Sequence, residues 1–274
     1  MLCKLQNIEI YYEIYGEGIP ILMIHGFTPD HHIVKGPMEP IFQNRSGFKR
    51  IYFDLPGMGK TEGKKWIKNS DQILEIVTQF IEKIIPNEKF LIVSESYGGY
   101  LARGLIYKNL YQILGICFIC PLIVPDPQKR ELPEFTPIIQ EKSLLETIDP
   151  KFRDEFENFV IIQNERVWKG YKDNVLIGLQ AADQKFLDDI FSKGYAFSFD
   201  VDKMKKKFEK PVLFLLGKQD IAVGYKDAWK ILESYPRASF VILDKAGHLL
   251  EVEQNILFES LLNEWLDRVI ETIN

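Results

Sequence analysis

The sequence has few cysteines and no hydrophobic run long enough to cross a membrane. Only three of its 274 residues are cysteine, which favours a reducing compartment over a disulfide framework. The apolar stretch at residues 113–124 is shorter than the roughly 20 residues of a spanning helix and contains Pro121. The N-terminal segment lacks the apolar core of a signal peptide. We therefore expect a cytoplasmic protein without a membrane span.

The sequence also has no excess of positive charge. Its formal net charge is -5 and its pI is near 5.6, so we expect no nucleic-acid partner. The one basic run, Lys203 to Lys210, is interrupted by Glu209 and follows two aspartates, which indicates a solvated face. With 46% hydrophobic and 27% charged residues, the chain has the composition of a globular protein with a substantial core.

Short runs of β-branched and aromatic residues recur along the chain and predict buried strands. They cover residues 8–16, 19–26, 50–54, 89–94, 115–120, 211–217 and 239–243. The first two runs are joined at Gly16, Glu17 and Gly18, which is a hairpin signal. We therefore expect these two strands to pair with each other.

Stretches with apolar residues at three- and four-residue steps predict helices over residues 71–85, 97–109, 226–235 and 253–270. Strands that alternate with helices predict an α/β fold, with a mostly parallel sheet covered by helices on both faces. The alternation stops between about residues 121 and 200, where five prolines precede amphipathic segments such as 152–168. We expect a helical cap insertion, residues 122–199, in a core formed by residues 1–121 and 200–274.

Cys117 and Cys120 have the Cys-x-x-Cys spacing of redox and zinc sites. They lie in the predicted strand 115–120, where residues three apart point to opposite faces of a sheet. The two sulfur atoms therefore cannot easily meet, and the sequence has no second cysteine pair for a zinc site. We expect both cysteines to be structural.

A serine stands where the predicted strand 89–94 passes into a helix. The segment Ser94 to Gly98 forms a sharp turn, in which small residues two before and two after Ser96 let neighbouring backbone pass closely. Such a turn holds Ser96 in a strained conformation at the tip of the sheet. The N–H of Tyr97 and the positive end of the helix then face any oxyanion beside Ser96. We expect Ser96 to be a nucleophile.

A serine hydroxyl is a weak nucleophile by itself and requires a base, and histidine is suited to neutral pH. Of the four histidines, His248 lies in a loop after the strand 239–243, at the carboxyl edge of the sheet. Asp220 follows the strand 211–217 at the same edge and provides an orienting carboxylate. We therefore expect a triad in the chain order Ser96, Asp220, His248.

The loop after an earlier strand should provide a second donor to the oxyanion. His25-Gly26-Phe27 follows the apolar run that begins at Ile19, and Gly26 lets the chain turn without a side chain in the way. We predict the backbone N–H of Phe27 as this donor, beside that of Tyr97. His25 is expected to support the loop.

Two further patterns are similar to metal and nucleotide sites. His31 and His32 follow the oxyanion loop, but no further ligands stand at defined spacing, so we expect no metal there. The segment 54–61 ends in Gly-Lys-Thr like a P-loop, yet Asp54 occupies the first glycine position, where its charge repels phosphate. The sequence thus implies no metal and no organic cofactor.

Together these residues resemble the α/β-hydrolase superfamily, in its single-cap branch of esterases, lactonases and iminopeptidases. The resemblance covers nearly the whole chain and rests on the serine turn, residues 25–27, 54–59 and 217–220, and Gly247-His248. At Ser94 the family pattern more often has glycine. Some members of the family place the triad acid one strand earlier, which makes Asp126 the alternative to Asp220.

The resemblance implies hydrolysis of a carboxylic ester or a related small acyl substrate through an acyl-enzyme. Alternatives on the same triad are proline-iminopeptidase, carbon–carbon bond hydrolase and acyltransferase activity. An aminopeptidase needs acids to hold a free amine, and Glu131, Glu134 and Glu141 in the insertion are candidates. Alternatives of another class are a non-catalytic receptor for small molecules and a protein that docks a partner through its cap.

Overall fold

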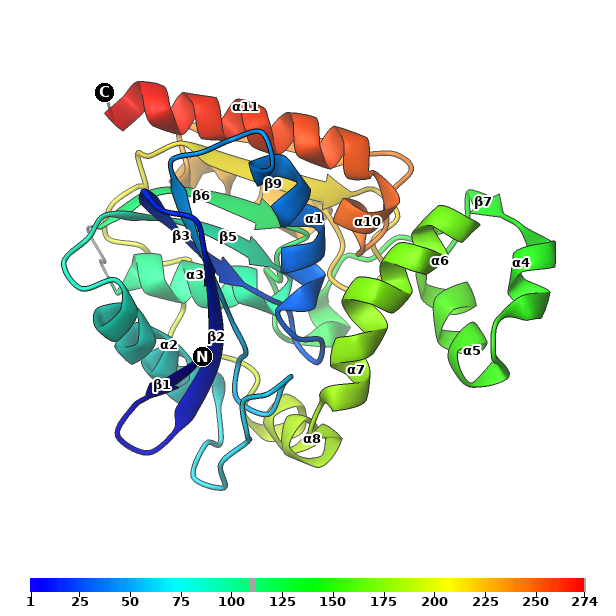
Figure 1. Cartoon of the computed structure of the whole chain (residues 1–274), viewed down its shortest axis with the longest axis horizontal. Coiled ribbons are helices and arrows are strands. Elements are labelled where there is room, and N and C mark those ends of the chain that lie inside the picture. The colour runs from blue at the N-terminus through cyan, green and yellow to red at the C-terminus, as the bar shows by residue number, and fades with distance from the viewer. Residues whose placement is uncertain (109–111, 274) are drawn as a thin grey trace.

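The computed structural model describes residues 1–108 and 112–273, with an eight-stranded sheet at its centre (Figure 1). The strand order is β1-β2-β4-β3-β5-β6-β9-β10. These strands are β1 (Leu2–Lys4), β2 (Glu9–Tyr15), β3 (Ile19–Ile24), β4 (Phe48–Phe53), β5 (Phe90–Glu95), β6 (Ile113–Ile119), β9 (Val212–Gly217) and β10 (Ala238–Leu243).

Most strand pairs in this sheet are parallel, which confirms the predicted α/β fold. Among the described strands both antiparallel pairs include β2, which pairs with β1 on one side and with β4 on the other. Every residue of β5 and of β9 is buried, because helices cover both faces of the sheet. This coverage explains why the central strands are continuous apolar runs without alternation.

The hairpin expected at residues 16–18 is wrong. The chain does reverse there, with Gly16 and Gly18 at positive φ, but β4 lies between β2 and β3 in the sheet. β3 is buried along nearly its whole length and runs parallel to both of its neighbours, β4 and β5. β2 is partly exposed and pairs near the sheet edge. Long-range burial of β3 therefore decides the pairing, whereas the turn sets only the reversal.

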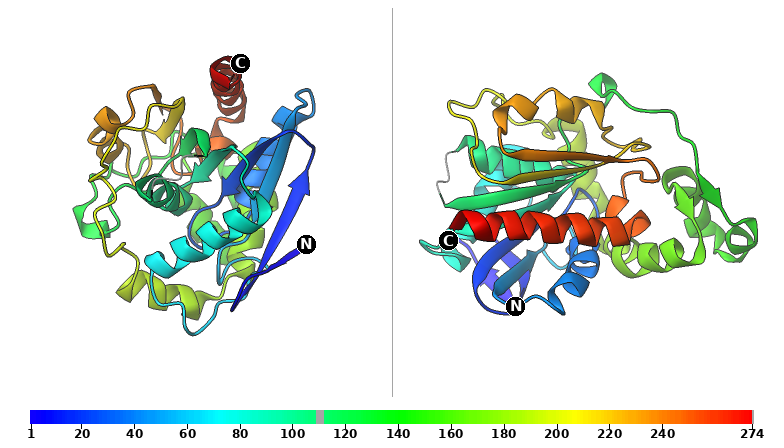
Figure 2. Two further views of the ribbon diagram at one scale, coloured as in Figure 1. Left: turned by 90° about the vertical axis from the view of Figure 1, so that its left-hand side faces the viewer. Right: turned by 90° about the horizontal axis from the view of Figure 1, so that it is seen from above.

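Two layers of helices enclose the sheet (Figures 1 and 2). α2 (Ser70–Ile84) and α3 (Tyr97–Tyr107) cover one face, and α1 (His32–Phe42) and α11 (Asn255–Ile273) cover the other. α2 begins where the Asn69 side chain accepts a hydrogen bond from the N–H of Gln72. Burial of each of its large apolar side chains contributes about 1.5–3 kcal/mol to the stability of the fold. The predicted helix end at Asn109 lies outside the described residues.

Two predicted helices differ from the structure, and one observed helix was not predicted. The predicted helix 226–235 is broken into α9 (Lys226–Trp229) and a 3₁₀ turn, Leu232–Ser234. The last predicted helix, 253–270, corresponds to α11, which begins at Asn255 and ends at Ile273, and the short helix α10 (Leu250–Glu253) precedes it. α1 was not predicted because it contains Pro37 and Pro40, which remove helical hydrogen bonds. Its five buried apolar side chains stabilise it despite this loss.

Between β6 and β9 the chain forms a mostly helical segment, which Figure 1 shows beyond the carboxyl ends of the parallel strands. The amphipathic segment predicted at 152–168 is interrupted by the short strand β8, so it is two helices. The elements are β7 (Ile139–Gln140), α4 (Lys142–Thr147), α5 (Pro150–Phe159), β8 (Ile162–Gln163), α6 (Glu165–Tyr171), a π-helical turn (Lys172–Leu176), α7 (Ile177–Ala181) and α8 (Gln184–Lys193).

The three cysteines are buried and free. Cys117 lies in β6, and Cys120 follows the end of that strand with a φ of 40°. Burial raises the pKa of both thiols, which disfavours the reactive thiolate. Among residues 1–108 and 112–273, no helix has the length and apolar character to cross a membrane.

Candidate active site

The turn between β5 and α3 holds Ser96 in a strained backbone conformation. Its φ is 50° and its ψ is -116°, a region that costs a non-glycine residue about 1–3 kcal/mol. The backbone of Ser96 is fixed on both sides, since its N–H donates to Ile119 and its carbonyl accepts from Leu122. A Cβ at Gly98 would overlap the carbonyl oxygen of Ile24, so this position requires glycine.

The structure brings Ser96, His248 and Asp220 together from three separate strand ends. Nε2 of His248 lies 2.9 Å from Oγ of Ser96, and Nδ1 lies 2.9 Å from Oδ2 of Asp220. The other oxygen of Asp220 accepts hydrogen bonds from the N–H groups of Ala222 and Val223, which fixes the carboxylate. A proton on Nδ1 that donates to Asp220 leaves Nε2 free to accept the serine proton.

Asp126, the alternative acid, is placed differently. It lies before a 3₁₀ turn, Pro127–Lys129, where its side chain accepts from the N–H of Gln128. Its side chain is 44% exposed and forms an ion pair with Lys129. This geometry favours Asp220, which is buried and bonded to His248.

The loop after β3 lies against Ser96. A Cβ at Gly26 would be 3.1 Å from that of Ser96 and would overlap the carboxyl of Glu95. The Phe27 ring packs edge-on against the Tyr97 ring at 5.2 Å. Tyr97 is the first residue of α3, so its N–H has no partner within the helix. The two predicted oxyanion donors therefore belong to residues that pack together beside Ser96.

His25 supports this loop through hydrogen bonds on both ring nitrogens. Nδ1 donates to the carbonyl of Gly26 at 2.8 Å, and Nε2 accepts from the N–H of Leu55 at 2.9 Å. The side chain is fully buried, and burial lowers its pKa, so the ring is neutral. These contacts join the loop after β3 to the loop after β4.

A cavity of about 220 Å³ opens over Ser96. Most of its lining is apolar, and five of its thirteen lining residues come from the segment between β6 and β9. It is smaller than the roughly 300–1,000 Å³ of sites for drug-sized ligands. The lining residues are Phe27, Thr28, Pro29, Ile33, Glu95, Ser96, Glu155, Phe159, Tyr171, Val175, Leu179, His248 and Leu249.

The glutamates that the sequence suggested for a substrate amine do not line this cavity. Glu131, Glu134 and Glu141 are exposed, and Glu131 pairs with Lys230. Glu155 of α5 lines the cavity in their place, beside Tyr171 of α6. No sequence pattern indicated this pair, because the helix face that turns toward Ser96 depends on how the segment folds back over the sheet.

Glu95 was also missed as a site residue, although it directly precedes Ser96. Its side chain is 2% exposed, and its Oε1 lies 3.4 Å from Nε2 of His248. Burial raises the pKa of Glu95 to about 7, with a further contribution from Asp220. Burial alone would lower the pKa of His248, but Asp220 and Glu95 outweigh it and raise that pKa to about 9.

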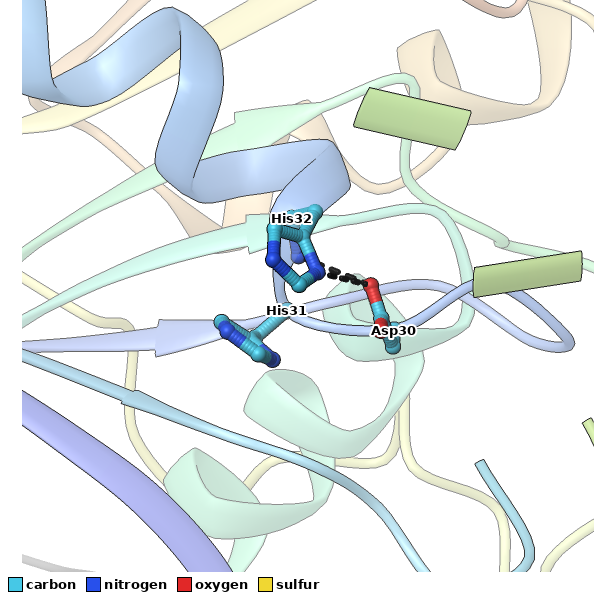
Figure 3. A group of neighbouring side chains, drawn as sticks. All are labelled: Asp30, His31 and His32. Atoms are coloured by element: carbon cyan, nitrogen blue, oxygen red, sulfur yellow. Dashed lines mark hydrogen bonds and ion pairs between the residues drawn. The ribbon is translucent and has the colours of Figure 1, made fainter. Parts of the chain in front are cut away.

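Asp30, His31 and His32 lie next to one another at the start of α1 (Figure 3). Figure 3 shows Asp30 facing His32, and Nδ1 of His32 lies 2.8 Å from its carboxylate. Nδ1 of His31 lies 2.7 Å from Asp54. Asp54 also accepts from the N–H of Lys60, so the P-loop-like segment folds around a buried carboxylate. The Nδ1 atoms of both histidines are therefore occupied by carboxylates.

A parallel sheet with a serine at a strand-to-helix turn, facing a histidine and an aspartate from later strand ends, defines an α/β hydrolase. The sequence model of the Hydrolase_4 family, described as serine aminopeptidase, S33, matches residues 20–255. The chain belongs to this family. This finding confirms the resemblance to α/β hydrolases that the sequence motifs indicated.

Relatives and solved structures are similar along almost the whole chain. A pimeloyl-acyl-carrier protein methyl ester esterase of Legionella pneumophila is 22% identical over 94% of this chain and 99% of its own. A proline iminopeptidase of Saccharolobus solfataricus is 22% identical over 97% of this chain and 91% of its own.

The crystal structure of an alpha/beta superfamily hydrolase from Oenococcus oeni matches with a TM-score of 0.88 and 29% identity. It covers 98% of this chain and 99% of that protein. The family and these relatives establish the protein as a hydrolase, with similarity to both esterases and iminopeptidases. The expected fold and enzyme class are confirmed.

Proposed function

We propose that this protein is a serine esterase that cleaves small carboxylic esters through an acyl-enzyme. Ser96 is the nucleophile, His248 the general base and Asp220 the group that orients His248. The proposal depends above all on one observation, the two 2.9 Å contacts that join Ser96 Oγ, the imidazole and Asp220 in a line. The ester substrate of the Legionella relative supports it.

In the first half of the reaction, Nε2 of His248 takes the proton of Ser96 as Oγ attacks the ester carbonyl. The N–H groups of Phe27 and Tyr97 donate to the oxygen that becomes negative. The tetrahedral intermediate then releases the alcohol, which receives the proton from Nε2. In the second half, Nε2 takes a proton from water, which attacks the acyl-enzyme and releases the acid.

The substrate is a small molecule with a short acyl group, because the cavity of about 220 Å³ is small and its lining is mostly apolar. Residues 122–199 act as a cap over the core formed by residues 1–121 and 200–274. The five cavity residues from this segment support that division. The free cysteines fit a cytoplasmic protein.

A fluorophosphonate probe tests the nucleophile. Mass spectrometry of the treated protein should show one covalent adduct that is lost in Ser96→Ala. The matched control is Ser94→Ala, because Ser94 is buried two residues away and its hydroxyl points to the carbonyl of Cys117. Folded wild-type protein without an adduct would contradict the hydrolase mechanism and favour a non-catalytic receptor.

A panel of p-nitrophenyl esters tests the substrate size. We expect kcat/KM to be highest for acetate or butyrate and to fall for chains of about eight carbons or more, which exceed the cavity. Constant or rising kcat/KM with chain length would contradict a closed, short acyl site.

A second function, proline-iminopeptidase activity, is favoured by the position of Glu155. Glu155 lines the cavity on the side of residues 122–199, and its carboxylate could hold the free amine of a peptide substrate there. Hydrolysis of proline p-nitroanilide, lost in Glu155→Gln while p-nitrophenyl acetate is still cleaved, would establish this activity. If wild-type protein cleaves p-nitrophenyl acetate but not proline p-nitroanilide, the iminopeptidase activity is excluded and the esterase activity stands.

A further inference from the structure

Glu95 is a buried carboxyl group that the proposed mechanism does not use. It lies at the end of β5, directly before Ser96. Its Oε1 is 3.4 Å from Nε2 of His248, the same nitrogen that contacts Ser96 Oγ at 2.9 Å. Its Oε2 has no hydrogen-bond partner among the described residues. Glu95 therefore adjoins the atom through which the reacting proton must pass.

The proton on Nε2 is affected by the charge of Glu95. When Nε2 carries a proton, ionised Glu95 attracts it, and the imidazolium then lies between two carboxylates, Glu95 and Asp220. When Nε2 carries no proton, its lone pair faces an oxygen of Glu95, and the two acceptors repel each other unless Glu95 is protonated. One proton is thus shared between the imidazole and Glu95.

The other groups around Glu95 do not balance its charge. Besides His248, the titratable groups that face it are Asp220 after β9, Glu251 in α10, Cys120 after β6 and Tyr195 after α8. Burial raises the pKa of Glu251 well above its ordinary value, which favours the neutral form of this carboxyl. Among these groups, the imidazolium of His248 alone can carry the positive charge that stabilises ionised Glu95.

We propose that Glu95 is a positioning residue that holds a proton on Nε2 of His248 and thereby sets the pH at which His248 becomes a base. This inference rests on the proposed function, since Glu95 acts through the imidazole. The imidazolium cannot accept the serine proton, so the ionised pair is an inactive form. Loss of the shared proton frees Nε2 and starts the reaction.

The pH dependence of kcat/KM tests this role. Wild-type protein should gain activity as the pH rises, with an acidic limb well above pH 7. Glu95→Gln keeps the shape of the side chain but removes its charge, so the midpoint of that limb should fall by about one pH unit or more. The matched control is Glu62→Gln, because Glu62 is an exposed carboxylate that pairs with Lys64. The acidic limb of the Glu62→Gln pH profile should coincide with that of wild type.

An unchanged limb in folded, active Glu95→Gln would overturn the proposal. Fluorophosphonate labelling separates the two failures: unlabelled wild-type protein refutes the esterase itself, whereas labelled protein with coincident limbs refutes only the role of Glu95.

If Glu95→Gln does not fold, NMR of histidine-labelled wild-type protein tests the role of Glu95 instead. The His248 Cε1 resonance should titrate well above the ordinary histidine pKa of about 6.5 and show a second inflection from Glu95. A single inflection near 6.5 would overturn the proposal.

Discussion

At the scale of single residues, a substitution of Asp220 tests whether the proposed triad depends on one tautomer of His248. In Asp220→Asn, the amide oxygen can still accept from Ala222 and Val223, but the NH₂ group faces Nδ1. Nδ1 must then accept, so the proton moves to Nε2 and blocks the base. We expect kcat for p-nitrophenyl acetate to fall about 10³–10⁴-fold with the fold intact.

Asp126→Asn is the control for this experiment, because Asp126 is the alternative acid and its partner is Lys129. Its kcat should remain within about twofold of wild type. A large loss in Asp126→Asn together with a small loss in Asp220→Asn would reverse the assignment of the acid.

Some site residues can be predicted from the sequence around them, whereas others depend on the tertiary fold. The proximity of Ser96, Asp220 and His248 was predictable because each lies in the turn or loop after a strand, and parallel strands end at one edge of the sheet. Glu155 and Tyr171 were not, since they reach the cavity through the fold of a segment without strand order. Glu95 was visible in the sequence, but its role depends on a distance that no spacing encodes.

At the scale of elements, Glu253 of α10 joins the insertion to the His248 loop. Its Oε1 accepts from the N–H groups of Ile161 and Ile162 at 2.6 and 3.4 Å, and its Oε2 accepts from Gly247 at 2.5 Å. One buried carboxylate thus joins the start of β8 to Gly247, the residue before His248. This contact couples the position of the insertion to the position of His248.

Glu253→Gln should lower both the stability of the protein and its activity. Glutamine provides one acceptor oxygen, and its NH₂ group would face a backbone N–H, so a buried donor loses its partner. We expect the free energy of unfolding in urea to fall by about 2–4 kcal/mol, and kcat/KM to fall with it. The matched variant is Glu251→Gln in the same helix, because neither carboxylate oxygen of Glu251 has a partner among the described residues. A loss as large in Glu251→Gln would show that the loss does not come from these hydrogen bonds.

The sequence predicted the type and position of most strands better than it predicted which strands pair. Apolar runs located the central strands within one or two residues, because each strand is covered on both faces and its sequence records that burial. Whether β2 pairs with β3 or with β4 depends on residues of β4 that lie 35 to 41 positions further along the chain, and the glycine turn carries no information about them. α1 was missed because its two prolines have low helix propensity. In the folded protein, burial of its apolar side chains offsets that cost.

At the scale of the whole molecule, Arg103 of α3 holds both ends of the insertion. Its guanidinium donates to the carbonyls of Leu122 and Ile123 at 3.0 and 3.2 Å and forms an ion pair with Asp202. The side chain is 1% exposed. Because Leu122 and Ile123 begin the segment 122–199 and Asp202 follows its end, one buried group anchors both ends of the segment to α3.

Arg103→Lys should destabilise the protein by about 2–3 kcal/mol in urea unfolding. A single ammonium group cannot reach three acceptors in two directions, so buried carbonyls lose their donors. Arg45→Lys is the control, since Arg45 pairs with the exposed Asp267 and should change stability by less than about 1 kcal/mol. Equal effects of the two substitutions would contradict an anchoring role for Arg103.

The charge of the buried site also sets how the stability of the whole molecule varies with pH. The pKa of His248 is raised to about 9 in the folded state, against about 6.5 when unfolded, so between pH 7 and 8 the folded protein binds more protons. Stability must therefore fall as the pH rises through this window, by up to about 1.4 kcal/mol per pH unit for one proton. Urea unfolding at pH 7.0, 7.5 and 8.0 should show this decline in wild type and a flatter one in Glu95→Gln, whose His248 pKa is lower. Stability that rises with pH in wild type, or equal slopes in the two proteins, would mean that Glu95 does not hold a proton on His248.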